Sequence, residues 1–277
     1  MSTDPRIHPI DPKATAAATY DAAADFYDHP TNSWDRFGRR TIERLRLAPG
    51  ARVLDVCCGS GASAIAAAEM VGPKGLVLGV DLAEKLLALG RAKARARGLQ
   101  NVDFRLGDLL DLGMPDAQFD AVVCVFGIFF VPDMSVAVRE LWRAVRPGGK
   151  LAITTWGPNV FEPAATAFWN AIHEVRPDLH KAFTPWDRIA DPSAVRALLR
   201  ASGIDRAEVI PEAGSHAIPT PEAWWVAVLG SGYRGTVEQL DPRDRERVRE
   251  ANLDFVRRSG ITSVEANAIY AVATKDA

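Results

Sequence analysis

Apolar residues follow two different spacings along this chain, and the two alternate from residue 51 onward. Short, nearly continuous apolar runs are typical of buried strands, and they occur in "RVLDV", "GLVLGVD", "VDFRLGD", "FDAVVCVFG" and "KLAITTWG". Between most of them lie segments with helical spacing, "ASAIAAAEM", "AEKLLALGRAKAR" and "SVAVRELWRAVRPGG". Strands separated by helices of this length pair in parallel through right-handed crossovers, so the pattern predicts a doubly wound α/β sheet.

The segments outside this alternation add helices and two further strands. Two helical segments, "ATAAATYDAAADFYDHP" and "WDRFGRRTIERLRL", precede the sheet and are broken near His29 and Pro30. Towards the C-terminus, "DPSAVRALLRASG" predicts an Asp-capped helix, and "RAEVI" and "SVEANAIYAVATK" predict strands. Two insertions, at about residues 158–189 and 219–260, begin just past strand ends. Open α/β sheets bind ligands there, so we interpret both insertions as cap elements over a pocket.

Composition and charge narrow the classes of function. The formal net charge is −2 and the isoelectric point about 6.2, so no basic excess favours nucleic acid or an anionic membrane surface. No apolar run approaches the roughly 20 residues that span a bilayer, and no signal peptide is visible, so we expect no membrane insertion. Three cysteines without a CxxC pair indicate reduced thiols in a cytoplasm and no metal site.

A glycine turn in "VLDVCCGSG" joins the first strand to the first helix. Gly59 and Gly61 let the backbone approach a ligand, and Asp81 ends the second strand, where ribose hydroxyls can donate to its carboxylate. Asp108 ends the third strand, where it can accept from the exocyclic amine of adenine. Cys57, Gly59 and Ala62 fill two of the three places of the dinucleotide pattern G-x-G-x-x-G/A, so at this point NAD stays open.

The order of the motifs is more selective than any one of them. "VLDVCCGSG", "LGVDLAEKLLALGRAKA", "VDFRLGDLLDL", "FDAVVCVFGIFFVPDM" and "RAVRPGGKLAITTW" stand at spacings that resemble class I S-adenosylmethionine-dependent methyltransferases. The likeness is greatest to the group similar to the ubiquinone/menaquinone biosynthesis C-methyltransferases. It covers about residues 20–156 closely and the last strand more loosely. With this family in view, we expect a mostly parallel, seven-stranded, Rossmann-like sheet whose last strand is antiparallel.

The resemblance implies a site for S-adenosyl-L-methionine. Asp81 would hold the ribose hydroxyls, Leu82 would pack on the adenine, and Asp108 would meet its polar edge. Residues 1–48 would form a helical segment that closes over the cofactor, and residues 49–277 would form the methyltransferase domain. The implied cofactor-binding residues are Tyr20, Tyr27, Cys57, Gly59, Gly61, Asp81, Leu82, Gly107, Asp108, Leu109, Cys124 and Val125.

Cys57 departs from the family pattern G-x-G-x-G, because it replaces the first glycine. A cysteine fits there if the backbone is extended, and it is strained if the position needs a positive φ. We expect cofactor binding to survive the replacement.

The acceptor is expected to be a small, partly apolar or aromatic metabolite. Many relatives have histidines in the loop after the fourth strand, where this chain has two phenylalanines. The residues proposed for the acceptor pocket are Phe126, Phe129, Phe130, Trp156, Trp186 and Trp224. Weak candidates for a catalytic base are His173, His180 and His216, and Asp133 and Glu222 are secondary candidates. A homodimer is left open, as is the atom that accepts the methyl group.

Two other functions compete with methyl transfer. A NAD(P)-dependent oxidoreductase of the short-chain type needs Tyr-x-x-x-Lys, and no tyrosine of this chain has a lysine four residues later. A protein that binds S-adenosylmethionine without transferring its methyl group is compatible with Cys57 and with the missing histidines.

Overall fold

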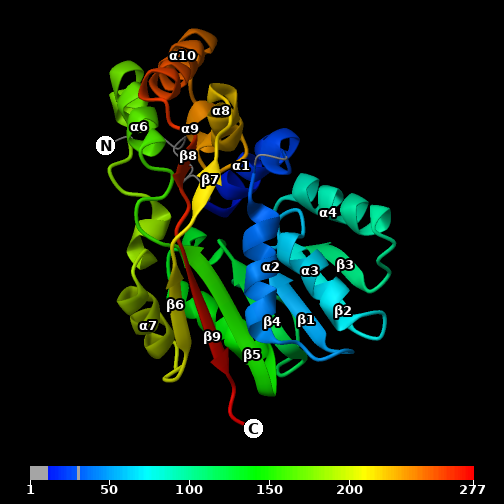
Figure 1. The fold of residues 1–277 in the computed structure, drawn as a ribbon. Helices are drawn as coiled ribbons and strands as arrows, with labels where there is room; N and C mark the ends of the chain where they lie inside the picture. The colour runs from blue at the N-terminus through cyan, green and yellow to red at the C-terminus, as the bar shows by residue number, and fades with distance from the viewer. Residues whose placement is uncertain (1–11, 30–31) are drawn as a thin grey trace, which may run out of the picture.

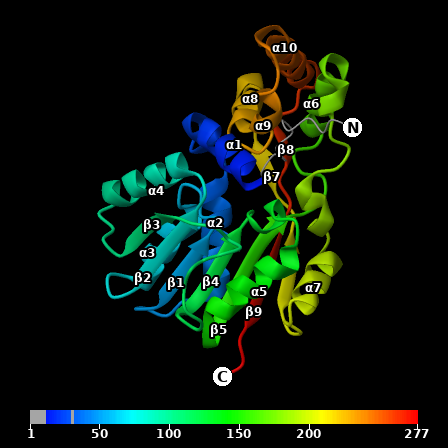
Figure 2. The same cartoon turned by 180° about the vertical axis from the view of Figure 1, so that it is seen from behind.

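The computed structural model describes residues 12–29 and 32–277. A seven-stranded sheet in the order β3-β2-β1-β4-β5-β9-β6 forms its centre (Figures 1 and 2). All pairings are parallel except those of β9 with β5 and β6, so the expected antiparallel last strand and Rossmann-like topology are confirmed. The strands are β1 (Arg52–Val56), β2 (Leu76–Asp81), β3 (Val102–Leu106), β4 (Phe119–Val125), β5 (Val145–Trp156), β6 (Glu208–Glu212) and β9 (Ala268–Thr274).

Helices cover both faces of this sheet. On one face lie α2 (Trp34–Leu45), α3 (Ala62–Val71) and α4 (Glu84–Ala96), and on the other lie α5 (Met134–Ala144) and α7 (Pro192–Ala201) (Figures 1 and 2). Successive strand residues therefore enter different cores, as Val53 and Leu54 of β1 do. Because both of their faces are buried, the central strands β1, β2 and β4 are largely apolar, which is why they stood out in the sequence.

The remaining helices gather at the carboxyl end of the parallel strands (Figure 1). They are α1 (Pro12–Tyr27), α6 (Ala164–Val175), α8 (Pro221–Leu229), α9 (Arg234–Val237) and α10 (Pro242–Ser259), with the short turns η1 (Ile128–Phe130), η2 (Pro177–Leu179) and η3 (Pro185–Ile189). The two predicted insertions supply all of these elements except α1 and η1. None of the described helices is long and apolar enough to cross a bilayer.

Two predicted boundaries differ from the structure. Helix α5 stops at Ala144, five residues before the end of its predicted segment, because Pro147 and Gly148, with a φ of +75°, interrupt the helix. The single strand predicted for "SVEANAIYAVATK" is two strands, β8 (Ser263–Glu265), which pairs with β7 (Ser215–Ala217), and β9. Asn267 separates them, since its side chain accepts from the backbone of Gly214 and donates to the carbonyl of Pro158.

The break between the first two helices is confirmed. Helix α1 ends at Tyr27 and α2 begins at Trp34, while Pro30 lies outside the described residues. The amide of Asn32 donates to the carbonyl oxygens of Phe26 and Tyr27. These bonds satisfy carbonyls of the last turn of α1, which otherwise have no partner in the helix.

Candidate functional site

One cavity lies at the carboxyl ends of the central strands, under α1 and the segment between α8 and α9. The turns after β1, β2, β3 and β4 form its floor, where a doubly wound sheet binds its ligands. Its lining includes these predicted residues: Tyr20, Tyr27, Cys57, Gly59, Asp81, Leu82, Gly107, Asp108, Leu109, Val125, Phe126, Phe129, Phe130, Trp156 and Trp186. The structure thus brings most of the predicted cofactor residues and most of the predicted acceptor residues into one space.

Asp81 connects the glycine turn to the next helix. The backbone N–H of Gly59 donates to one carboxylate oxygen of Asp81 at 2.8 Å, and the N–H of Ala83 donates to the other at 2.9 Å. Burial raises the pKa of the Asp81 carboxyl, and the backbone hydrogen bonds oppose that rise. Each carboxylate oxygen accepts about two hydrogen bonds, so both retain capacity for a ligand's hydroxyl groups.

Polar contacts hold helix α1 over the half of the cavity that contains the glycine turn, Asp81 and Asp108. Lys13 forms an ion pair with Asp108. Asp21 accepts from a backbone N–H in the first turn of α4 at 2.9 Å, and Asp28 accepts from the hydroxyl of Ser60 at 2.6 Å. The helix is therefore fixed at its beginning, middle and end to the elements that form the floor.

The glycine turn has a left-handed backbone at the position of the cysteine. Cys57 has a φ of +59°, in the region that favours glycine, so of the two backbones considered for this position it has the one that strains a cysteine. A hydrogen bond to Cys124 and burial both raise the pKa of the Cys57 thiol, which stays protonated. Gly59 also has a positive φ, and a Cβ atom on it would lie 2.8 Å from the hydroxyl oxygen of Tyr27. The turn needs glycine at 59 and carries strain at 57.

The two predicted tyrosines of α1 lie together. Their rings meet edge to face with centroids 6.1 Å apart, and Tyr20 also meets Phe130 at 5.6 Å. Tyr27 stacks on Trp34 at 5.3 Å. Burial, the largest cause, and the nearby Asp81 raise the pKa of both phenols, which are therefore neutral and can donate hydrogen bonds.

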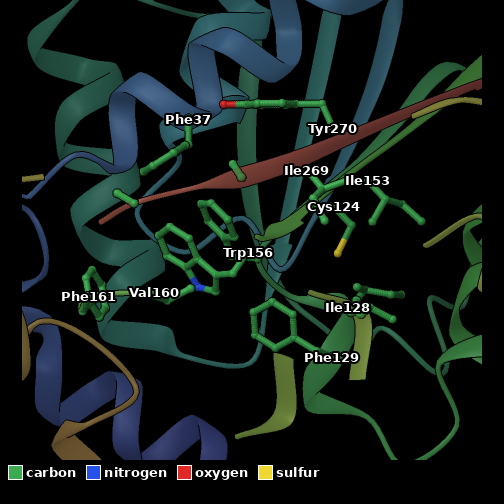
Figure 3. Packing of buried hydrophobic residues seen from close by; sticks show 14 of the residues in the cluster. Phe37, Cys124, Ile128, Phe129, Ile153, Trp156, Val160, Phe161, Ile269 and Tyr270 are labelled. Carbon is green, nitrogen blue, oxygen red and sulfur yellow. The ribbon is translucent and has the colours of Figure 1, made fainter. Parts of the chain in front are cut away.

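The opposite half of the cavity is aromatic. Phe126 and Trp156 stack at 3.9 Å, Phe129 meets Trp186 at 5.8 Å, and Phe161 meets Trp156 at 5.6 Å. Figure 3 shows Trp156 with Phe161 to its left, among the buried side chains of this cluster. Among the described residues, the charged side chains of the lining are Lys13, Asp81 and Asp108, which belong to the other half. The aromatic half therefore suits a neutral ligand.

Three predicted residues do not line the cavity. Gly61, with a φ of +84°, caps α3 and makes room for the ring of Phe104, which would lie 2.7 Å from a Cβ atom. Cys124 is fully buried in the core behind the cavity. Trp224 is 0% exposed and its indole N–H donates to Asn252 at 2.9 Å. Each has a packing role that the sequence pattern could not separate from a binding role.

The candidate bases lie outside the cavity as well. His173 and His180 face each other in the cap with ring centroids 5.2 Å apart. His216 lies behind the aromatic wall, which Trp34, Trp156 and Phe161 form. Asp133 is the N-cap of α5, where it accepts from the backbone N–H groups of the first turn, and Glu222 is exposed beside an arginine. None of these groups faces the cavity directly.

Several lining residues escaped the sequence analysis. Trp34, Phe161, Ser231 and Tyr233 come from the start of α2, the loop after β5 and the α8–α9 segment. The only sequence signal was the position of the last three in or beside the predicted cap insertions. Spacing alone does not show which aromatic residue of an insertion turns towards the sheet.

Comparison with known proteins agrees with this geometry. The model of the ubiE/COQ5 methyltransferase family matches residues 15–185, which is more than half of the chain. The chain belongs to the ubiE/COQ5 methyltransferase family. This is a class I family that depends on S-adenosyl-L-methionine, so the predicted family and the predicted cofactor class are confirmed.

Curated relatives of this family match a little less than half of the chain. The demethylmenaquinone methyltransferase of Listeria welshimeri is 40% identical over 126 residues, which are 45% of this chain and 53% of that protein. The protein of the same name from Geobacillus kaustophilus is 42% identical over 121 residues, 43% of this chain and 52% of that protein. The chain thus spans about half the length of the curated relatives it matches.

Solved structures share the fold at low identity. The YcgJ protein of Bacillus subtilis has a TM-score of 0.57 and 20% identity, over 87% of this chain and 99% of that one. A phosphoethanolamine N-methyltransferase of Haemonchus contortus has a TM-score of 0.60 and 16% identity, over 97% of this chain and 61% of that one. The cyclase SpnF has a TM-score of 0.57 and 20% identity, over 95% and 96%. Identities this low show the fold alone.

Proposed function

We propose that this protein transfers a methyl group from S-adenosyl-L-methionine to a small, neutral, partly apolar or aromatic metabolite. The observation that carries the proposal is the single cavity with two different halves. One half has the glycine turn, Asp81 and Asp108, and the other has an aromatic lining. A donor and an acceptor bound in one water-poor space can be aligned for direct transfer.

The first half fits the cofactor. Asp81 offers free acceptor capacity to the ribose hydroxyls, and Asp108 offers a carboxylate to the adenine amine. Gly59 has no side chain beside Tyr27, so the space between the glycine turn and this tyrosine stays open for the cofactor. Closure of α1 over the cofactor belongs to the proposal, and it is supported by the contacts of Lys13 and Asp28 with the floor.

The chain's own contribution to the reaction would be alignment and exclusion of water. The cofactor supplies a methyl group already activated on a sulfonium, so a strong base is needed only if the acceptor is a weakly acidic hydroxyl. Tyr20 and Phe130 lie where the two halves meet and would separate the reacting groups from solvent.

The experiment is calorimetric titration with S-adenosylmethionine, S-adenosylhomocysteine and NAD. We expect both adenosyl ligands to bind and NAD not to bind. Asp81→Ala should weaken binding by at least about tenfold, because it removes charge-assisted hydrogen bonds. Asp103→Ala is the matched control, since Asp103 is exposed on β3 and does not line the cavity. Binding of NAD alone would contradict the proposal.

The second candidate is a protein that binds the cofactor for another reaction. One observation favours it: no histidine among the described residues lines the cavity. In addition, the fold is similar to that of the cyclase SpnF. Incubation with methyl-labelled cofactor and a panel of phenols, quinols and naphthols distinguishes the two. Labelled product supports methyl transfer, and tight cofactor binding without product from any acceptor favours the second candidate. A cytoplasmic location and a homodimer remain predictions.

A further inference from the structure

A second, much smaller cavity lies directly behind the aromatic wall. Its volume is about 10 Å³, roughly the space that a single water molecule or one oxygen substituent needs. Trp34, Trp156 and Phe161 line both this cavity and the main one. These three rings are therefore the partition between the two spaces.

Two buried polar atoms in the lining residues lack a partner. The indole nitrogen of Trp34 and Nε2 of His216 have no hydrogen bond to any described residue and are closed to solvent. His216 is only 4% exposed, and its other ring nitrogen, Nδ1, lies 2.9 Å from the hydroxyl of Ser33, which fixes the orientation of the ring. Buried polar atoms without partners cost free energy and are rare, so two of them on residues that line one small cavity point to a missing ligand atom.

The chemistry of the two atoms defines that ligand atom. An indole N–H can only donate, whereas Nε2 of histidine donates or accepts according to its tautomer. An oxygen atom placed between them would accept from Trp34 and exchange a hydrogen bond with His216. A volume of about 10 Å³ suits one such atom, and the other walls of the cavity include the rings of Phe37 and Phe161 and the side chains of two alanines.

Phe161 lies between the two cavities and lines both. Its ring meets Trp156 at 5.6 Å and His216 at 6.4 Å. Its backbone is held at a φ of +64°, a strained value for a large side chain, by a hydrogen bond to the carbonyl of Glu265. With the backbone fixed, rotation of this side chain is the movement that would join the small cavity to the acceptor half.

We infer that the small cavity is a polar subsite of the acceptor pocket, in which Trp34 and His216 bind one oxygen substituent of an aromatic acceptor. The inference rests on the proposed function, which places that acceptor against Phe126 and Trp156. It makes His216 a residue that selects acceptors with an oxygen in one position. An aromatic compound without that oxygen would leave both polar atoms unpaired and would bind less well.

The test uses phenol and toluene as probes, because they differ in one hydroxyl group. Protein labelled with ¹⁵N and saturated with S-adenosylhomocysteine is titrated with each while the indole N–H signals are followed. The signal of Trp34 is identified by its loss in Trp34→Phe. We expect phenol, and not toluene, to move that signal downfield. The ratio of phenol affinity to toluene affinity should fall roughly three- to tenfold in His216→Phe and in Trp34→Phe.

The control is His173→Phe, because His173 lines neither cavity and should keep the ratio of the unchanged protein. If one variant fails to fold, the other still decides the ratio. The same response to phenol and toluene, including no response to either, would overturn the inference. A water signal at the Trp34 indole that phenol does not displace would overturn it too, because the cavity would then hold only a structural water. Failure to bind S-adenosylhomocysteine, measured first, would refute the proposed function instead.

Discussion

A Cβ atom at position 127 would lie 2.3 Å from the Cβ atom of Cys57, so the side chain that Gly127 lacks would occupy the space of the cysteine. The sulfur of Cys124 lies 3.1 Å from the same point. The chain has a side chain where its family pattern has glycine, at a φ of +59°, and a glycine directly opposite. The structure accommodates the side chain of Cys57 because residue 127 is a glycine and has no side chain.

This relationship predicts strong coupling between positions 57 and 127. Gly127→Ala should lower the free energy of unfolding by about 1–3 kcal/mol, because the added methyl group overlaps a buried side chain. In a Cys57→Gly background the same change should cost much less, since the space is then free. Urea unfolding of the two single variants and the double variant measures the coupling. Additive effects would contradict the geometry.

Asp55 predicts a pH dependence of stability. It is buried on β1, one oxygen accepts from the hydroxyl of Ser63 at 2.6 Å, and the other has no partner among the described residues. Burial raises its pKa from 3.8 to about 7, so its contribution to stability is complete below pH 4 and is lost as the pH rises through 7. The loss is up to roughly 4 kcal/mol. Asp55→Asn should flatten the stability profile between pH 4 and pH 8.

The matched control for that experiment is Asp103→Asn, because Asp103 is an exposed carboxylate on β3, two strands away from β1. It should leave the profile unchanged. Thermal unfolding across the pH range measures both variants. An Asp55→Asn protein with the original pH profile would show that this carboxyl is already solvated in the folded protein.

Trp224 distinguishes a core tryptophan from a pocket tryptophan. Trp224→Phe should lower the free energy of unfolding by about 1–3 kcal/mol, because it leaves the Asn252 oxygen buried without its donor. Cofactor affinity should not change. Trp186→Phe is the comparison, since Trp186 lines the cavity and is only partly buried; it should change the response to aromatic probes with little effect on stability. The reverse result would place Trp224 in the pocket.

The absence of a side chain at Gly230 lets the end of α1 pack closely against the cap. A Cβ atom there would lie 2.6 Å from the amide nitrogen of Asn32 and 2.8 Å from the carbonyl oxygen of Phe26. Gly230→Ala should therefore loosen α1, speed hydrogen exchange along it, and weaken cofactor binding. Gly232→Ala is the control two residues away, because its Cβ would make only an ordinary 3.6 Å contact with Tyr20. Equal exchange rates in the two variants would contradict this role.

Local patterns determined most of the fold in advance. The central strands and their crossover helices could be located because burial on both faces makes each strand a continuous apolar run. The motif order then located Asp81 and Asp108, since residues at the carboxyl ends of parallel strands meet at one edge of the sheet. The split of the last strand could not be foreseen, because it depends on where the Asn267 side chain finds distant backbone partners.

The sequence by itself determined the sheet, its family and the half of the cavity that the strand ends form. Only the tertiary structure decided the other half. It turned Trp34, Phe161 and Tyr233 inward, buried Trp224 in the core, and gave Cys57 a left-handed backbone opposite Gly127. The physical reason is that strand ends follow from local periodicity, whereas the direction of a cap side chain depends on packing between segments more than a hundred residues apart.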